Sequence, residues 1–200
     1  MAPDIRKLTE TVIGRVIAHT EELTALDAAI GDADHGLNMK RGCEAVLADI
    51  ETLAAKPLPE ALKAIGMTLV MKVGGASGPM YGTLFMTLGK ELNGEPSAAE
   101  AGRALGAAVD AMKQRGKADL GQKTMLDVLA PIADALKEEA TTITDIRTKA
   151  RSLAEATIPM KATRGRASFL GERSIGHMDP GARSSEIMIG AICDVLENRA

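Results

Sequence analysis

Three aspartates lie within eight residues, at Asp27, Asp32 and Asp34, in the stretch LDAAIGDADHGLNMKRG. Glycines flank the last two of them, and the stretch contains no lysine or arginine before Lys40. Three like charges this close together repel one another unless a cation offsets them. This spacing makes metal binding the first chemistry to consider.

The ligand types favour a hard cation. The letters DADHG resemble the start of an EF-hand, but the later ligand positions of such a loop fall on Gly36 and Cys43, so the EF-hand fails. Zinc prefers histidine and cysteine, and only His35 is near. Carboxylate ligation favours Mg²⁺, which keeps waters and shares its shell with phosphate oxygens. The alternative is a solvated acidic loop whose aspartates cap helices.

A second glycine-rich segment, GGASGPMYG at residues 74–82, is suited to an anion. Pro79 stands at a natural first helical position, and the Ser77 hydroxyl lies near the expected cap. Backbone N–H groups at such a helix start can bind phosphate. The alternative is that the small residues only let two helices pack closely.

A third segment, MKATRGRASFLGERSIGHMDPG at residues 160–181, has no helical or strand period and contains Arg164, Arg166 and Arg173. Long irregular loops in compact domains are usually functional, and arginine pairs well with phosphate, although all three side chains could instead be solvated. Three carboxylates carry about −3 and two Mg²⁺ about +4, so the remainder plus one arginine offsets most of a nucleoside diphosphate's charge of about −3. The sequence has no Walker or protein-kinase motif.

Composition narrows the class of protein. Two hundred residues with 46% apolar content fit one domain over residues 1–200. A net charge of −3 and 2% aromatic residues argue against a nucleic-acid surface, and any bound base must lie against aliphatic and methionine side chains. No apolar run approaches the length of about 20 residues that a membrane span needs, which predicts a cytoplasmic protein. Cys43 and Cys193 are expected to be buried thiols.

The period of 3.6 residues recurs along nearly the whole chain, with no strand pattern, and predicts an all-α fold. We predict eight helices with short connections, arranged as an up-and-down antiparallel bundle or barrel with the site at one end. Ser97 and Glu100 form a capping box, and Pro131 should kink the sixth helix. The predicted helices span residues 4–29, 38–53, 57–73, 79–92, 97–114, 124–139, 144–159 and 182–198.

Four motifs carry a family resemblance. GDADHGLNM, GGASGPMYGT, RGKADLGQKTMLDV and KATRGRASFLGERSIGHMDPGA resemble, in order and across nearly the whole chain, the nucleotide-binding L subunit of bacterial dihydroxyacetone kinase. The resemblance implies an eight-helix barrel that holds ADP or ATP through two Mg²⁺ ions bound by the three aspartates. It also implies nucleotide contacts at His35, Gly36, Leu37, Asn38, Ala76, Ser77, Gly116, Thr124, Met125, Arg173, Asp179, Pro180 and Gly181.

The same resemblance implies a divided enzyme. In this family a separate K subunit holds the ketose covalently through a histidine, so this chain would act only with partners, in a homodimer or hetero-oligomer. The form GDADHG resembles the branch in which bound nucleotide is a coenzyme, recharged by a phosphohistidine carrier, the M subunit, of the phosphoenolpyruvate phosphotransferase system. Arg173 would act catalytically by offsetting charge on the leaving oxygens, and the loop should close over bound nucleotide. The alternatives are an ATP-exchanging kinase subunit for another short ketose and a non-catalytic nucleotide sensor that binds a transcription regulator.

Overall fold

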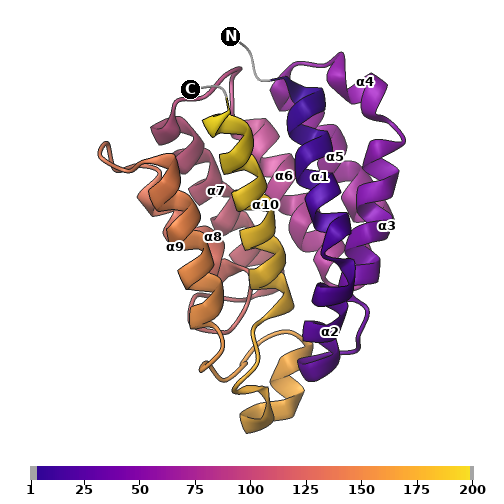
Figure 1. Ribbon diagram of the computed structural model, residues 1–200, viewed down its shortest axis with the longest axis vertical. Coiled ribbons are helices and arrows are strands. Elements are labelled where there is room, and N and C mark those ends of the chain that lie inside the picture. Colours follow the sequence, from indigo (N-terminus) through magenta and orange to yellow (C-terminus); the bar gives the residue numbers. More distant parts are fainter. Residues whose placement is uncertain (1–3, 199–200) are drawn as a thin grey trace.

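The computed structural model describes residues 4–198, and within that range every regular element is helical, so the all-α prediction is confirmed. The elements are α1 (Ile5–Ala18), α2 (Thr20–Ile30), α3 (His35–Leu47), α4 (Ile50–Ala54), α5 (Leu58–Lys72), α6 (Ser77–Glu91), α7 (Ala98–Gly116), α8 (Leu126–Ala135), α9 (Ile143–Ala156), the 3₁₀-helix η1 (Arg166–Ser174) and α10 (Pro180–Glu197). Figure 1 shows the long helices running along one common direction, with the start of α1 and the end of α10 at the same end of the molecule.

Packing contacts among the long helices run in a closed circuit through α1, α3, α5, α6, α7, α8, α9, α10 and back to α1. Each helix therefore lies between two neighbours and turns an apolar side toward the middle, as a helical barrel requires. Fully buried side chains such as Leu23, Met112 and Leu126 belong to one cluster that joins most of these helices. A second cluster around Val128 and Ile146 fills the space between α8, α9 and α10.

Two predicted helices are each divided in the structure. The first breaks at His19 into α1 and α2, where His19 Nδ1 lies 2.7 Å from the carbonyl oxygen of Arg15 and satisfies a group that the break would orphan. The second breaks at Asp49 into α3 and the short α4. Each break interrupts the helix for only one or two residues, so the apolar period continues across it. Periodicity alone therefore cannot locate either break.

The remaining helices match their predicted ranges to within a few residues, except that α8 ends at Ala135, before the predicted Glu139. The capping box is confirmed: the Ser97 hydroxyl accepts from Glu100 N–H at 3.3 Å, and the Glu100 carboxylate accepts from Ser97 N–H at 2.8 Å. The loop predicted to be irregular contains η1, which is interrupted at Gly171 by a positive φ of 56°.

Figure 1 places η1 and the end of α2 together, at the end of the molecule opposite to the start of α1 and the end of α10. The loop that follows α9 packs there, since Ala162 and Ala167 form a small buried cluster with Ile30 of α2. Among residues 4–198, no helix is both long and apolar enough to cross a bilayer. Both cysteines are free and buried, as predicted.

Candidate functional site: an acidic cluster beside a cavity of helix N-termini

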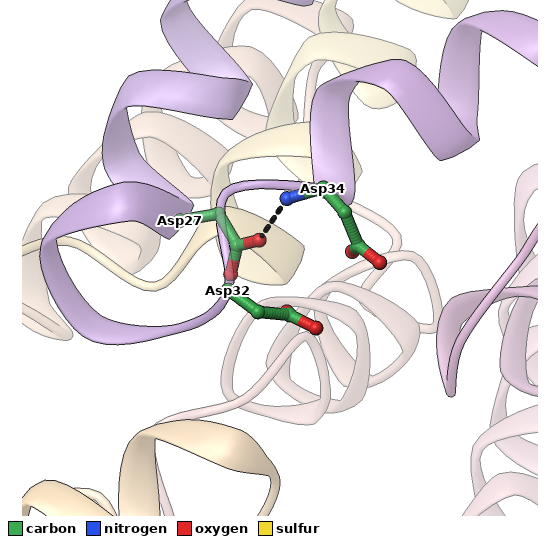
Figure 2. Close-up of side chains that lie close together, drawn as sticks. All are labelled: Asp27, Asp32 and Asp34. Atoms are coloured by element: carbon green, nitrogen blue, oxygen red, sulfur yellow. Dashed lines mark hydrogen bonds between the residues drawn. The ribbon is translucent and has the colours of Figure 1, made fainter.

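The three aspartates converge at the turn between α2 and α3. Each offers a carboxylate oxygen, and these oxygens all lie within 4.8 Å of one another. Figure 2 shows the carboxylates of Asp32 and Asp34 directed to the same side of this turn, with the Asp27 carboxylate behind them. The chain reverses direction here through Ala33, whose φ of 62° is left-handed and therefore strained for a residue with a side chain. The turn brings the three carboxylates together at that local cost.

Asp27 is held rigidly. Its Oδ2 accepts backbone hydrogen bonds from Asp34 N–H at 2.8 Å, drawn in Figure 2, and from His35 N–H at 3.1 Å. These two bonds leave Oδ1 as the oxygen of Asp27 that can bind an external ligand. Gly31 lies directly against that oxygen, because a Cβ at residue 31 would lie 2.0 Å from Asp27 Oδ1. A side chain at position 31 would therefore displace the carboxylate.

The cluster carries more negative charge than its protein neighbours offset. Two unit charges at the 4.8 Å limit repel by about 3 kcal/mol at an effective dielectric constant of about 20. Arg166 of η1 pairs with Asp32, with 2.9 Å between Nε and Oδ2, but its side chain is 67% exposed, so the pair contributes little. A hard divalent cation fits this set of three oxygen donors, and the residues present thus suit Mg²⁺.

A cavity of about 210 Å³ lies beside the aspartates. The starts of four helices line it: His35 of α3, Ser77 of α6, Leu126 of α8 and Pro180 of α10. Each helix N-terminus carries the positive end of a helix dipole, so four of them at one cavity favour a multiply charged anion. Carboxylates that could hold a metal ion on one wall and helix starts suited to an anion on the others match a metal-bound polyphosphate.

Lys123 fixes one wall of the cavity. Its side chain is 1% exposed and its backbone has a φ of 61°, just before α8. Burial lowers the pKa of Lys123, and the nearby Asp179 opposes that shift. Its ammonium group donates to backbone carbonyls at both ends of the loop over residues 160–181, those of Thr157 at 2.7 Å, Ile158 at 3.3 Å, Met160 at 3.1 Å and His177 at 2.5 Å. One buried charge thus holds the two ends of that loop together.

Asp127 fixes the turn before α8 in a similar way. Its carboxylate accepts from Thr124 N–H at 2.7 Å and from Gly121 N–H at 2.5 Å.

Asp179 caps the start of α10 by accepting from Ala182 N–H at 2.7 Å. Burial raises the pKa of Asp179 to about 7, and the charge of Asp127 adds to the increase, against the opposing bond from Ala182. The carboxyl group of Asp179 therefore titrates near neutral pH.

His35 is buried in the cavity wall, beside the aspartates as expected. Its Nδ1 lies 3.0 Å from the Ser77 hydroxyl and its Nε2 lies 3.0 Å from the Ser184 hydroxyl. Burial lowers the pKa of His35, although Asp27 and Asp34 oppose the shift. The imidazole is therefore neutral at pH 7.

The structure brings most of the predicted site residues to one place. The cavity and its rim include Asp27, Asp32, Asp34, His35, Ala76, Ser77, Gly116, Thr124, Met125, Asp179, Pro180 and Gly181.

Gly36, Leu37, Asn38 and Arg173 do not line the cavity. Gly36 packs against α2, where a Cβ would lie 2.1 Å from the Thr20 carbonyl oxygen. Asn38 is buried and accepts from Arg41 at 2.6 Å, and Leu37 is 58% exposed. Arg173 is exposed on η1, and its catalytic role stays a prediction.

Sequence reasoning missed Lys123, Tyr81, Ser184 and Asp127, all of which are buried at or behind the cavity. Asp127 follows Thr124 by three residues, the spacing of a capping box, so a local signal for it exists. The other three carry no local signal, because a lone lysine in a loop ordinarily faces solvent and a lone tyrosine or serine in a helix faces solvent or fills the core.

Comparison with known proteins agrees with this geometry. Residues 29–194 match the DAK2 domain family. The chain is 44% identical over 179 residues to "PEP-dependent dihydroxyacetone kinase 1, ADP-binding subunit DhaL" of Listeria innocua serovar 6a, covering 89% of this chain and 88% of that protein. It is 42% identical over 179 residues to the corresponding PEP-dependent subunit of Escherichia coli K12, covering 85% of each.

More distant relatives contain this domain within longer chains. "Triokinase/FMN cyclase" of Homo sapiens is 32% identical over 200 residues, which cover 94% of this chain but 34% of that protein. The crystal structure of the dihydroxyacetone kinase from C. freundii in complex with AMP-PNP and Mg²⁺ superposes with a TM-score of 0.78 at 24% identity, covering 95% of this chain and 33% of that one. This superposition shows that the two chains share a fold.

Proposed function

We infer that this chain, which belongs to the DAK2 domain family, is the ADP-binding subunit of a PEP-dependent dihydroxyacetone kinase. One observation carries the inference: three carboxylates meet within 4.8 Å beside a cavity lined by four helix N-termini. Metal ligands and anion-binding helix starts are both needed to hold a nucleotide polyphosphate. Relatives at 37–44% identity are named ADP-binding subunits of PEP-dependent or PTS-dependent dihydroxyacetone kinases, and these names support ADP as the nucleotide.

In this proposal, Asp27, Asp32 and Asp34 hold two Mg²⁺ ions, which neutralise phosphate charge when bound. Gly31 leaves room for the Asp27 oxygen that faces the metal. The start of α6 and the Gly181 N–H of α10 hold the phosphates, since Pro180 has no N–H and the N–H of Ala182 is bonded to Asp179. The aliphatic and methionine side chains of the cavity, Ile30, Met80 and Met125 among them, offer the apolar surface that adenine needs in a chain with 2% aromatic residues.

The chain has no site for a ketose in this proposal, so the acceptor comes with the partner. A K subunit would present dihydroxyacetone, and a phosphohistidine carrier would recharge ADP to ATP. The chain's own task is to orient the terminal phosphoryl group and to keep water from it. A cytoplasmic location and assembly with these subunits are part of the proposal.

Two arginines compete for the catalytic role. The family resemblance assigns it to Arg173, whereas Arg166 is the arginine that contacts a metal-binding aspartate, at 2.9 Å from Asp32. Replacing each by lysine keeps the charge and removes the planar fork that pairs with phosphate. In the reconstituted reaction, loss of kcat in Arg173→Lys alone would support the resemblance, and loss in Arg166→Lys alone would transfer the role to Arg166.

The central test is ADP binding by the purified chain, measured by calorimetry with and without Mg²⁺. We expect Mg²⁺-dependent binding in the wild-type chain and a loss of at least about 100-fold in the double variant Asp32→Asn/Asp34→Asn. Asp110→Asn is the matched control, because Asp110 is an exposed aspartate on α7 outside the cavity. Equal affinity in the double variant and the control would refute the proposal.

A second experiment distinguishes a coenzyme from an exchanging substrate. Nucleotide that survives gel filtration and accepts phosphate from a phosphohistidine carrier indicates the PEP-dependent mechanism. Nucleotide that is lost on the column and replaced by free ATP indicates the ATP-exchanging kinase instead. In either case the chain alone should form no dihydroxyacetone phosphate until a K subunit is added.

A further inference from the structure

A chain of buried hydrogen bonds runs from the cavity wall into the core. It begins at the Ser77 hydroxyl, which lines the cavity, passes through both nitrogens of His35 at 3.0 Å each, and reaches Ser184. The Ser184 hydroxyl then lies 2.6 Å from the Tyr81 hydroxyl. Ser184 and Tyr81 are both 0% exposed, and neither has a part in the function proposed above.

The protonated nitrogen of His35 determines what Ser77 can offer to the cavity. A neutral imidazole donates from one nitrogen and accepts at the other. If Nδ1 carries the proton, it donates to Ser77 Oγ, and the Ser77 proton can point into the cavity. If Nε2 carries it, Ser77 must donate to Nδ1, and only oxygen lone pairs then face the cavity. An anion in the cavity would be attracted in the first case and repelled in the second.

The groups behind His35 favour the first arrangement. The Tyr81 hydroxyl can donate to Ser184 at 2.6 Å, to Ser185 at 3.1 Å or to the Gly181 carbonyl at 3.2 Å, and the contact with Ser184 is the shortest of the three. A phenol is also a stronger donor than an aliphatic hydroxyl. With the Tyr81 proton directed to Ser184, the Ser184 proton can go to His35 Nε2 at 3.0 Å or to the Gly181 carbonyl at 3.1 Å. Imidazole nitrogen is the better acceptor. Each bond in such a chain strengthens the next, and all of the donors then point toward the cavity.

We propose that Ser184 and Tyr81 are positioning residues that fix His35 as its Nδ1–H tautomer, so that the Ser77 hydroxyl donates to a phosphate oxygen in the cavity. The inference rests on the proposed function for the identity of the anion. The tautomer itself is a property of the chain alone, so it can be measured without nucleotide.

The test combines a spectrum with a binding measurement. Long-range ¹H–¹⁵N spectra of the ¹⁵N-labelled chain report which nitrogen of each histidine is protonated, and the loss of one set of signals in His35→Gln assigns those of His35. We expect Nδ1–H in the wild-type chain. Ser184→Ala should lose that single tautomer and weaken Mg-ADP binding about 10-fold, the typical effect of one hydrogen bond to a charged group.

Ser185→Ala is the matched control. Ser185 is the next residue on α10, is equally buried, and lies 3.1 Å from the Tyr81 hydroxyl without contacting His35. It should keep both the wild-type tautomer and the wild-type affinity, whereas a merely structural role of Ser184 would make the two variants alike.

Three results would overturn the inference: an Nε2–H tautomer in the wild-type chain, an unchanged tautomer in Ser184→Ala, or a changed tautomer with unchanged affinity for Mg-ADP. Failure of the proposed function would look different, because the wild-type chain would then bind no Mg-ADP while the tautomer could still be read from the spectrum.

Discussion

Replacing Gly31 by alanine should impair the proposed metal site without removing any of its aspartates. A Cβ at residue 31 would lie 2.0 Å from Asp27 Oδ1, whereas real Cβ atoms essentially never approach a heavy atom closer than 3.0 Å. The carboxylate must therefore move by about 1 Å, well beyond the tolerance of about 0.2 Å for metal–ligand distances. We expect divalent-metal affinity to fall about 10- to 100-fold, or about 1.4–2.7 kcal/mol.

The metal can be followed directly with Mn²⁺, whose free concentration is measured by electron paramagnetic resonance in the presence of ADP. The matched control is Gly14→Ala. Gly14 lies exposed on α1, and a Cβ there would meet no atom within 4 Å. This control should bind Mn²⁺ like the wild-type chain and unfold at a slightly higher temperature, because alanine is favoured over glycine in a helix by up to about 1 kcal/mol.

Overpacking at Gly31 should also destabilise the fold, by about 1–3 kcal/mol, so circular dichroism must first show that Gly31→Ala is folded at the assay temperature. A folded Gly31→Ala chain with wild-type Mn²⁺ affinity would refute the reasoning, since Asp27 Oδ1 would then not be a metal ligand.

Three further predictions concern the groups around the cavity. Lys123→Met should lower the free energy of unfolding by about 3 kcal/mol, because buried carbonyls at both ends of the 160–181 loop lose their donor, and thermal unfolding should show a drop of about 6–12 °C. The pKa of Asp179 is about 7 in the folded chain against an ordinary 3.8, so folding favours the protonated carboxyl group. The protonated group contributes its full stabilisation below about pH 4, and raising the pH through 7 removes about 4 kcal/mol from the free energy of unfolding. Asp179→Asn keeps a cap for Ala182 and should flatten the dependence of urea midpoints on pH, measured without metal; an unchanged slope would contradict the assigned pKa. Ala33→Gly should stabilise the chain by up to about 1 kcal/mol in urea unfolding, because glycine adopts a φ of 62° without strain. A destabilised variant would show that Ala33 does not have this left-handed conformation.

Local chemistry makes much of this site predictable from the amino-acid sequence. Asp27 lies in the last turns of α2, and Asp32 and Asp34 lie in the turn that follows it, so residue type and spacing are enough to predict that their carboxylates meet. The existence of the helices follows from the apolar period, and the box at Ser97 and Glu100 follows from a three-residue spacing. Each of these features involves residues within about one or two turns of one another. At such short separations, residues that are close in sequence are also close in space.

Other features depend on how the helices close into one body. His35 and Ser184 are 149 residues apart in sequence and 3.0 Å apart in space, and Tyr81 and Ser184 are 103 residues apart. Lys123 reaches carbonyls 34 to 54 residues further along the chain. No local pattern distinguishes these side chains from other residues of their types in helices and loops. Packing buries them, and burial then requires a hydrogen-bond partner for each polar group, so the tertiary structure alone determines their roles.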